Sequence, residues 1–331
     1  MARLARIASI SVLAAAVLYV PVRRWAAGGA CESQARMDGK TVIITGANTG
    51  IGKVTARDMA ERGARVILAC RSLEKAEEAA KEIRSQTGNK NVVVQKLDLA
   101  SLTSVRQFAK AINGAEPRLD VLINNAGVMH TPRWETEDGF EMQFGVNHLG
   151  HFLLTNLLLD KLKKSAPGRV VTVASLVHAF AKGIDFDDIN SQNNYRPETA
   201  YDHSKLANVL FSRELSKRLK GTGVTSNSLH PGVIMESDLM RYREGTWQGN
   251  FGKRVASALR KVVGTVFSVF GKTLEQGAQT SICCAVAEEL ETTTGLYFSD
   301  CVPKETSAAG MDDEAAARLW DVSEKMVGLK S

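Results

Sequence analysis

The sequence predicts an α/β fold with a single doubly wound parallel sheet that carries helices on both faces. From Lys40 onward, short runs rich in β-branched residues alternate with longer helical patterns, and such alternation indicates crossover helices between parallel strands. One of these runs leads directly into a glycine-rich turn. Apolar residues make up 44% and charged residues 24% of the 331 residues, which is usual for a globular protein and excludes disordered and collagen-like chains.

The expected elements follow one another without internal repeats. Strands are expected at Thr41–Thr45, Arg65–Cys70, Asn91–Leu97, Val121–Asn124, Arg169–Ala174, Val224–Leu229 and Leu296–Phe298. Helices are expected at Ile51–Arg62, Leu73–Ser85, Leu102–Ile112, Phe144–Lys164, Tyr201–Lys220 and Asp313–Val327, the last of which stops at Gly328. We assign residues 38–331 to one domain.

The N-terminal segment, residues 1–37, is expected to lie outside this domain. Ile7–Val22 is an apolar run that would reach about 24 Å as a helix, short of the ~30 Å hydrocarbon core of a bilayer. Arginines stand on both sides of the run, and the first acidic residue is Glu32. These features fit a cleaved signal peptide, a short membrane anchor or an organellar targeting segment, followed by a linker.

The net charge of +6 does not indicate a nucleic-acid partner. Lysines and arginines are scattered, without the basic stripe and interleaved aromatic residues that such binding needs. The five cysteines form no C-x-x-C pair, so we expect reduced thiols and no metal site.

The glycine-rich turn after the first strand predicts a Rossmann-type nucleotide site. Gly46 would permit the tight turn, Gly50 would let the backbone approach a pyrophosphate, and Gly52 would let helix and strand pack closely. The free N–H groups at the start of the helix would bind the phosphates. The cofactor residues expected in this turn are Gly46, Asn48, Thr49, Gly50, Ile51 and Gly52.

The end of the second strand predicts NADP(H) as the cofactor. A fold that prefers NAD carries an acidic residue here for the ribose 2′-hydroxyl, whereas this chain has Ala69-Cys-Arg71. Arg71 could pair with a 2′-phosphate, or it could be an ordinary surface arginine. After the third strand, Asp98 and the adjoining Leu99 would hold the adenine, unless Asp98 caps the next helix.

Tyr201 and Lys205 form the expected catalytic pair. Residues four apart share a helix face, and an ammonium group near a phenol stabilises the phenolate and lowers the pKa of the tyrosine. Such a tyrosine can act as a general acid or base near neutral pH. Ser175, at the carboxyl end of a strand, would hydrogen bond to the substrate oxygen and polarise it, or else it caps the next loop.

Asn147 is the remaining candidate for this site. Its amide would hold a water molecule that links Lys205 to solvent, unless it satisfies backbone groups within its helix. His148, His151 and His203 have no carboxylate at metal-ligand spacing, and we therefore interpret them as structural.

Together, these motifs resemble the short-chain dehydrogenase/reductase family from about Lys40 to Phe298. The matching motifs are Thr45-Gly46-x-x-x-Gly50-x-Gly52, Asn124-Asn-Ala-Gly127, Ser175, Tyr201-x-x-x-Lys205 and His230-Pro-Gly232. The resemblance implies that Tyr201 exchanges the proton and that Ser175 orients the carbonyl. It also implies that Lys205 binds the nicotinamide ribose and that Asn147 completes a proton relay. Further cofactor contacts are implied for Asn125, Ala126, Gly127, Pro231, Gly232 and Val233.

Within the family, the chain is similar to the retinol dehydrogenase subgroup. The stretch from Arg133 to Phe152, Asp185–Asp188 and Ala69-Cys-Arg71 carry this likeness, which implies NADP(H) and a retinoid substrate. The linker Gly28-Gly-Ala-Cys31 and the tail around Leu319–Leu329 resemble a member attached to the mitochondrial inner membrane; the membrane of the endoplasmic reticulum is the alternative. One departure follows Gly232, where Ser237 is the nearest hydroxyl and the subgroup has an earlier threonine.

Residues 233–272 are expected to form a lid over the site. Trp247, Phe251 and the apolar run Val262–Phe270 suit a cover that excludes water from an apolar substrate, although helix packing or membrane contact would need similar residues. The sequence thus predicts an NADP(H)-dependent oxidoreductase that reduces all-trans-retinal or a similar lipid aldehyde. The alternatives are a reductase of other lipid or steroid carbonyls and a cofactor-binding scaffold without turnover. The sequence is compatible with an oligomer, and the direction in the cell depends on the NADPH/NADP⁺ ratio, which no residue encodes.

Overall fold

The central sheet has the doubly wound arrangement that the sequence predicts. The computed structural model describes residues 21–234, 239 and 271–330. Its strands are β1 (Thr41–Thr45), β2 (Arg65–Cys70), β3 (Val92–Lys96), β4 (Val121–Asn124), β5 (Gly168–Val173), β6 (Val224–His230), β7 (Tyr297–Ser299) and β8 (Val302–Lys304). Their order is β3-β2-β1-β4-β5-β6-β7-β8. The strand order reverses between β1 and β4, and ligands of open α/β sheets bind at such a reversal.

The last strand departs from the prediction of a wholly parallel sheet. β8 pairs antiparallel with β7, so that Tyr297 lies opposite Lys304, whereas the strands from β1 to β7 are parallel. Asp300 and Cys301 connect the two strands with φ angles of +56° and +63°, a tight turn that replaces a crossover helix.

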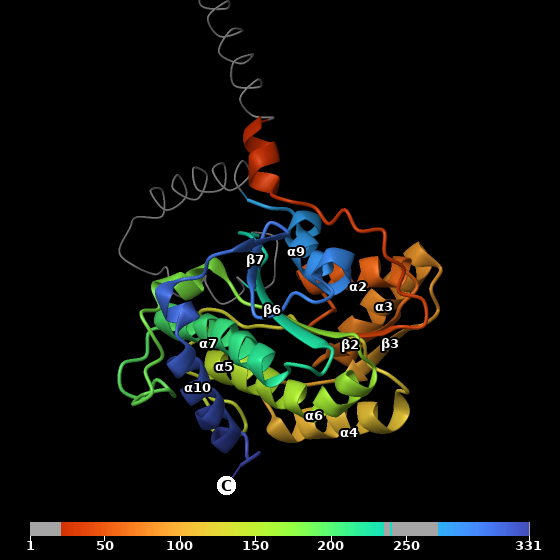
Figure 1. The fold of residues 1–331 in the computed structure, drawn as a ribbon. Coiled ribbons are helices and arrows are strands. Elements are labelled where there is room, and N and C mark those ends of the chain that lie inside the picture. Colours follow the sequence, from red (N-terminus) through yellow and green to blue (C-terminus); the bar gives the residue numbers. More distant parts are fainter. Residues whose placement is uncertain (1–20, 235–238, 240–270, 331) are drawn as a thin grey trace, which may run out of the picture.

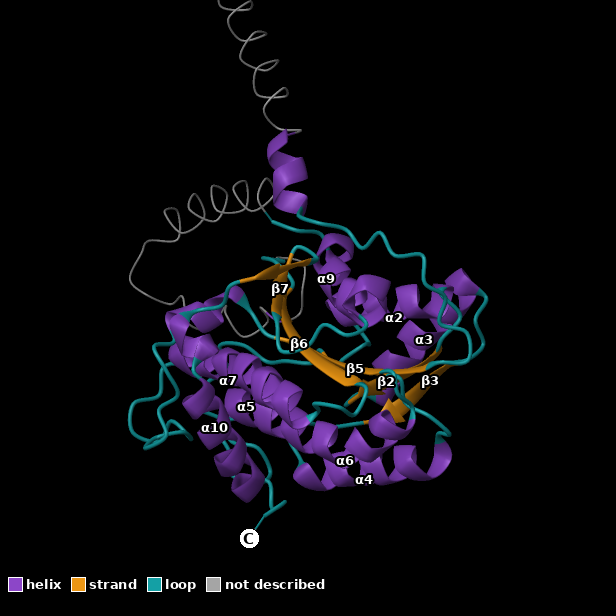
Figure 2. Cartoon of the chain, viewed as in Figure 1, coloured by secondary structure: helices purple, strands orange, loops and turns teal. Residues whose placement is uncertain are grey.

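Helices cover both faces of the sheet (Figures 1 and 2). One face carries α2 (Gly50–Glu61), α3 (Leu73–Thr87) and α9 (Leu274–Val286), and the other carries α4 (Leu102–Ala115), α6 (Gly150–Lys164) and α7 (Pro197–Arg218). The terminal helix α10 (Asp313–Met326) packs on α7. Each helix layer therefore encloses its own hydrophobic core against the sheet.

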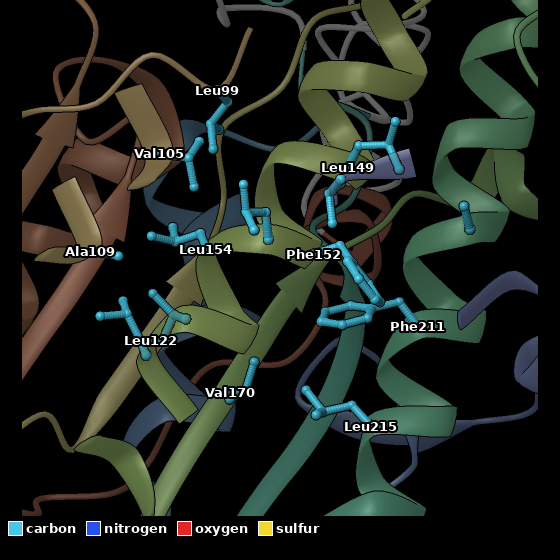
Figure 3. Packing of buried hydrophobic residues seen from close by; sticks show 14 of the residues in the cluster. Leu99, Val105, Ala109, Leu122, Leu149, Phe152, Leu154, Val170, Phe211 and Leu215 are labelled. Atoms are coloured by element: carbon cyan, nitrogen blue, oxygen red, sulfur yellow. The ribbon is translucent and has the colours of Figure 1, made fainter. Parts of the chain in front are cut away.

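Aromatic rings fill the core on the α6 and α7 side. The ring of Phe152 on α6 lies 5.6 Å from that of Phe211 on α7 and 4.9 Å from that of Trp320 on α10, measured between centroids. Figure 3 shows the two phenylalanines meeting above Val170 of β5. This packing holds α7 against α6 and α10 on one face of the sheet.

The long helix expected over Phe144–Lys164 is interrupted. It consists of a short α5 (Met142–Phe144), a π-helical segment (Gly145–Leu149) and α6. Gly150 packs so closely that a Cβ there would lie 2.6 Å from the Leu99 carbonyl oxygen. The π-helical segment contains Asn147, in keeping with the frequent occurrence of such segments at functional sites.

Two further helices differ from the prediction: one begins earlier than expected, and the other was not predicted. α7 begins at Pro197, which occupies the first turn, and not at Tyr201. α9 was not expected, although Thr273 and Gln276 form a complete capping box at its start. That signature is visible in the sequence as Thr-x-x-Gln before an apolar run.

The chain before β1 lies against the domain. Residues 21–27 are helical, and the following extended segment passes α9, where the Cys31 backbone N–H donates to Gln279 Oε1 at 2.9 Å. Arg62 donates to the carbonyls of Ser33 and Ala35 at 2.9 Å each. The predicted apolar run Ile7–Val22 falls almost entirely outside the described residues. Among the helices described, none is long and apolar enough to cross a bilayer.

Candidate active site

The glycine-rich turn joins β1 to α2 at the carboxyl edge of the sheet. Gly46 and Gly50 have φ angles of +66° and +60°, a conformation that residues with side chains rarely adopt. A Cβ on Gly52 would lie 2.4 Å from Asn125 Nδ2, so only glycine fits there. Thr49, the N-cap of α2, makes no side-chain capping bond, which leaves N–H groups of the first turn for an anion. The turn therefore fits a pyrophosphate.

Thr45 fixes the loop after β4 to this turn. Its hydroxyl oxygen accepts hydrogen bonds from the N–H groups of Asn125 and Ala126, each at 2.9 Å, and Asn125 Nδ2 donates to its carbonyl at 2.7 Å. Ala126 in turn packs on Gly46, where a Cβ would come within 2.9 Å. The loop is thus held at the position where the sequence analysis expected it to support the cofactor.

A cleft of about 740 Å³ runs along this edge of the sheet. Every residue that the sequence predicts as a cofactor contact lines it: Gly46, Asn48, Thr49, Gly50, Ile51, Gly52, Arg71, Asp98, Leu99, Asn125, Ala126, Gly127, Tyr201, Lys205, Pro231, Gly232 and Val233. Ser175 lines it as well, whereas Asn147 is buried behind it. The cleft therefore brings the expected nucleotide site and the expected catalytic residues together.

Positive charge gathers at the β2 end of the cleft. Arg71 is exposed there and makes no hydrogen bond or ion pair with another described residue. Lys75, in the first turn of α3, lines the same end and was not predicted. The sequence feature that could have predicted its role is its position four residues after Arg71. Lys53, by contrast, pairs with Glu82 at 2.5 Å, so its charge is already matched.

Asp98 lines the cleft but does not cap a helix. Its Oδ1 accepts the Ala100 N–H at 3.0 Å, whereas the N-cap of α4 is Ser101, which accepts the Ser104 N–H at 3.3 Å. The alternative that Asp98 caps α4 is therefore wrong, and the adenine contact stays a prediction.

Tyr201 and Lys205 lie on one face of α7, beside the end of β5. Ser175 Oγ accepts the Val177 N–H at 3.4 Å, and the Ser175 side chain is near enough to Tyr201 to lower the pKa of the phenol. Lys205 Nζ lies 5.6 Å from the centroid of the Tyr201 ring and donates to the Val173 carbonyl at 3.1 Å. The three predicted side chains are thus brought together by a strand end and the helix that packs on it.

Burial sets the protonation of this pair. Burial raises the pKa of Tyr201 above its usual value near 10, and the effect of Ser175 offsets only part of that rise. Burial also lowers the pKa of Lys205 to about 8. Burial is thus the largest effect on the Tyr201 pKa, and the lowering of that pKa by Lys205 stays a prediction. A protonated phenol at neutral pH can donate a proton.

Asn147 braces the loop after β4. Its Nδ2 donates to the Val128 carbonyl at 3.0 Å and to Ser204 Oγ at 2.9 Å, and its Oδ1 accepts the Val128 N–H at 2.8 Å. Both amide hydrogens are therefore used inside the protein. The predicted relay water would have to bind the second lone pair of Oδ1.

The loop after β6 is held by a lysine that the sequence analysis missed. Gly232 has a φ angle of +95°, and a Cβ there would lie 2.4 Å from Lys272 Cδ. Lys272 donates its backbone N–H to the Val233 carbonyl at 2.9 Å and pairs through Nζ with Asp300 at 2.5 Å. The ion pair thus fixes the Gly232 loop to the turn between β7 and β8.

The proposed lid, the cysteines and the expected absence of a metal site are the remaining features predicted from the sequence. Most of the proposed lid, with Ser237, Trp247, Phe251 and Val262–Phe270, falls outside the described residues. The five cysteines are free thiols in this structure. Across the described part of the chain, no group of His, Cys, Asp or Glu side chains is arranged to hold a metal ion.

Known proteins resemble this chain over most of its length. The model of the family described as short chain dehydrogenase matches residues 40–246. Retinol dehydrogenase 13 of Homo sapiens is 53% identical over 322 residues, which cover 97% of this chain and 93% of that protein. Retinol dehydrogenase 11 of Homo sapiens is 50% identical, with 93% and 92% covered.

Two solved structures share the fold. An uncharacterized protein from Mycobacterium Paratuberculosis has a TM-score of 0.70 at 35% identity, with 91% of this chain and 98% of that chain covered. The Pseudomonas aeruginosa RhlG/NADP active-site complex has a TM-score of 0.61 at 26% identity, with 80% and 95% covered.

Proposed function

Since the chain belongs to the short-chain dehydrogenase/reductase family, we propose that it is an NADP(H)-dependent reductase of all-trans-retinal or a similar lipophilic aldehyde. The chain is an NAD(P)-dependent oxidoreductase that acts on CH–OH groups. The predicted resemblance to retinol dehydrogenases, retinol dehydrogenase 13 among them, is confirmed. The choice of NADP(H), the substrate and the direction are what we propose.

One observation carries the proposal. Ser175 and Tyr201 line the same cleft as the glycine-rich turn and Arg71. A dinucleotide and a carbonyl compound can therefore occupy one continuous site. NADPH, when bound, supplies a hydride for the carbonyl carbon.

The side chains of the protein would complete the reduction at the carbonyl oxygen. The Ser175 hydroxyl would hydrogen bond to this oxygen and polarise the carbonyl, and the Tyr201 phenol would donate its proton to it. The pKa of Tyr201 lies above neutral pH, so the phenol carries the proton that it would donate. Lys205 would place a positive charge beside the developing phenolate.

The residues present fit NADP(H) better than NAD(H). No acidic side chain stands at the end of β2, where the sequence is Ala69-Cys-Arg71, and Arg71 and Lys75 line the cleft. Two cations can pair with the 2′-phosphate that distinguishes the two cofactors. The open N–H groups at the start of α2 suit the pyrophosphate.

The walls of the cleft near Ser175 suit an apolar substrate. Apolar side chains line the cleft, among them Leu176 and Val177, which follow Ser175 in the chain, and Met129, Trp134 and Met142. A polyene or long-chain aldehyde would be desolvated against these side chains. The names of the relatives point the same way, since they are retinol dehydrogenases.

For the N-terminal segment we propose attachment to a membrane, the mitochondrial inner membrane first and the endoplasmic reticulum as the alternative. The basic flanks, the absence of acidic residues before Glu32 and the likeness to retinol dehydrogenase 13 support this. Cell fractionation with alkaline carbonate extraction tests it. Recovery in the soluble fraction would refute it.

The test of function is turnover by the full chain with NADPH or NADH and a panel of retinal, straight-chain aldehydes and steroids. Retinol is best measured by chromatography, because retinal absorbs in the same range as NADPH. We expect NADPH-dependent retinal reduction that Tyr201→Phe abolishes. Tyr195→Phe is the matched control, since it removes a phenol hydroxyl that bonds to Thr131 and Gln143 and not to a catalytic residue.

The other outcomes separate the competing functions. Reduction of other carbonyls but not of retinal would favour a reductase of lipid or steroid carbonyls. NADPH binding without turnover of any carbonyl would favour a cofactor-binding scaffold. Turnover with NADH alone would refute the role given to Arg71.

A further inference from the structure

Two buried histidines contact the backbone carbonyls of two residues of the active site. His151 on α6 places Nδ1 3.0 Å from the Asn147 carbonyl oxygen. His178, in the loop after β5, places Nδ1 2.6 Å from the Ser175 carbonyl oxygen. A carbonyl oxygen only accepts hydrogen bonds, so in each ring Nδ1 must carry the hydrogen.

The second nitrogen of each ring meets a threonine hydroxyl from a distant part of the chain. His151 Nε2 lies 2.8 Å from Thr45 Oγ1, and His178 Nε2 lies 2.6 Å from Thr306 Oγ1. The two histidines therefore make the same bridge, from the carbonyl of an active-site residue through an imidazole to a threonine.

The partners of Thr45 define the state of His151. Thr45 Oγ1 already accepts the N–H groups of Asn125 and Ala126, so both of its lone pairs are used. Its hydrogen is then donated to His151 Nε2, since the alternative acceptor, the Ile123 carbonyl oxygen, is farther away at 3.5 Å. Only a neutral ring with its hydrogen on Nδ1 satisfies all these bonds.

Burial keeps both rings neutral. His151 and His178 are 1% and 2% exposed. Burial, with a smaller contribution from the nearby Lys205 charge, lowers the pKa of His151 to about 4. Burial likewise lowers the pKa of His178. At neutral pH each ring can therefore donate from Nδ1 and accept at Nε2 without a competing charge state.

We propose that His151 and His178 are positioning residues that hold Asn147 and Ser175 in their catalytic geometry by bridging their carbonyls to Thr45 and Thr306. This rests on the proposed function, which makes Ser175 and Asn147 part of the catalytic site. His151 ties the π-helical segment to the strand end that supports the cofactor loop. His178 ties the Ser175 loop to the segment before α10. Neither ring touches substrate.

Paired substitutions test the bridge. An asparagine amide nitrogen takes about the place of Nδ1, and a glutamine amide nitrogen about the place of Nε2. His178→Asn thus keeps a donor for the Ser175 carbonyl, and His178→Gln loses it; the same holds for His151 and Asn147. We expect both glutamine variants to lose roughly 10- to 100-fold in kcat, while the asparagine variants retain most of it. The Kd for NADPH should stay within about twofold of wild type.

His148 provides the matched control. It is buried in the same π-helical segment and contacts Ser323 Oγ at 2.8 Å, but it bonds to neither catalytic carbonyl. His148→Gln should lower the Tm without lowering kcat per NADPH-binding site. Wild-type kcat in His151→Gln and His178→Gln, or equal losses in the asparagine and glutamine variants, would overturn the proposal.

A spectroscopic measurement covers the case in which the variants do not fold. In histidine-labelled wild-type protein near neutral pH, ¹⁵N chemical shifts should show both rings neutral with the hydrogen on Nδ1. A cationic ring or the other tautomer at either position would overturn the proposal. This measurement needs no turnover. A wild-type protein inactive on every carbonyl would refute the proposed function, and the spectrum would still decide the histidine bonding.

Discussion

Lys205 lies beside Tyr201: its Nζ donates to the Val173 carbonyl at 3.1 Å and sits 5.6 Å from the centroid of the phenol ring. Burial moves the two pKa values in opposite directions, raising that of Tyr201 and lowering that of Lys205 to about 8. As the pH rises from neutrality, the lysine therefore loses its proton first. The phenol remains a donor after the charge beside it has gone.

This order predicts the pH dependence of reduction. We expect kcat/KM for NADPH to be nearly constant from about pH 6 to pH 7 and to fall as the pH rises through about 8, since this parameter reports groups of the free enzyme. The loss of the Lys205 charge, and not of the Tyr201 proton, would cause the fall. Steady-state rates across a constant-ionic-strength buffer series provide the measurement.

Lys205→Arg distinguishes this cause from others. A guanidinium keeps its charge over the whole range, so the residual activity of this variant should lack the alkaline fall. If the fall stayed at the same pH, another group would be responsible.

Arg71 should determine the preference between cofactors. Arg71→Asp replaces a cation of the cleft by the carboxylate that NAD-binding folds carry. Losing a charge-assisted hydrogen bond of roughly 1.5–3 kcal/mol should weaken NADPH binding about 10- to 100-fold, with NADH binding unchanged or tighter. Isothermal titration with each cofactor measures both effects.

Lys81→Asp is the control for the change of charge. Lys81 is exposed on the same helix as Lys75 but does not line the cleft. Equal weakening of NADPH binding by Lys81→Asp would mean that general electrostatics, and not a contact with the 2′-phosphate, causes the effect.

The sequence predicted those parts of the fold and of the site that depend on a local pattern of residues. The strand–turn–helix around Gly46, the Tyr201 and Lys205 spacing and Ser175 at a strand end are all legible in a few adjacent residues. The π-helical segment at Asn147 is not, because it accompanies the contact of Gly150 with the Leu99 backbone, 51 positions away in the chain. The direction of the Tyr201 pKa shift likewise depends on burial by distant segments. The histidine bridges join residues more than a hundred positions apart, which no local pattern reveals.

The capping box at the start of helix α9, which was not predicted, should contribute to stability. The Gln276 N–H donates to Thr273 Oγ1 at 3.2 Å, and Gln276 Oε1 accepts the Thr273 N–H at 3.1 Å. Thr273→Ala removes the cap and should lower the free energy of unfolding by ~0.5–2 kcal/mol. Chemical denaturation measures it. Thr103→Ala, at an exposed position early in α4 that is not its N-cap, should leave stability nearly unchanged. Equal losses of unfolding free energy in Thr273→Ala and Thr103→Ala would mean that the cap does not stabilise the protein.

The close contact at Gly52 predicts a combined loss of stability and cofactor binding. In Gly52→Ala, the new methyl group would lie 2.4 Å from Asn125 Nδ2 and 2.8 Å from the Gly46 carbonyl oxygen. Both neighbours belong to the nucleotide cradle, and neither can move without disturbing it. Overpacking of this kind costs ~1–3 kcal/mol, so the Tm should fall. NADPH should bind at least about tenfold more weakly, because the displaced backbone groups are those that face the pyrophosphate.

Gly114→Ala is the matched substitution in another helix. Gly114 lies in α4, and a Cβ there would meet nothing within 4 Å. Alanine is the better helix former by roughly 0.5–1 kcal/mol, so this variant should be as stable as wild type or slightly more so, with unchanged NADPH binding. Because both changes add one methyl group to a helical glycine, a difference between them isolates the space around Gly52. Wild-type NADPH affinity in Gly52→Ala would show that the cradle tolerates a side chain there and that the close approach of helix and strand is not required for the cofactor.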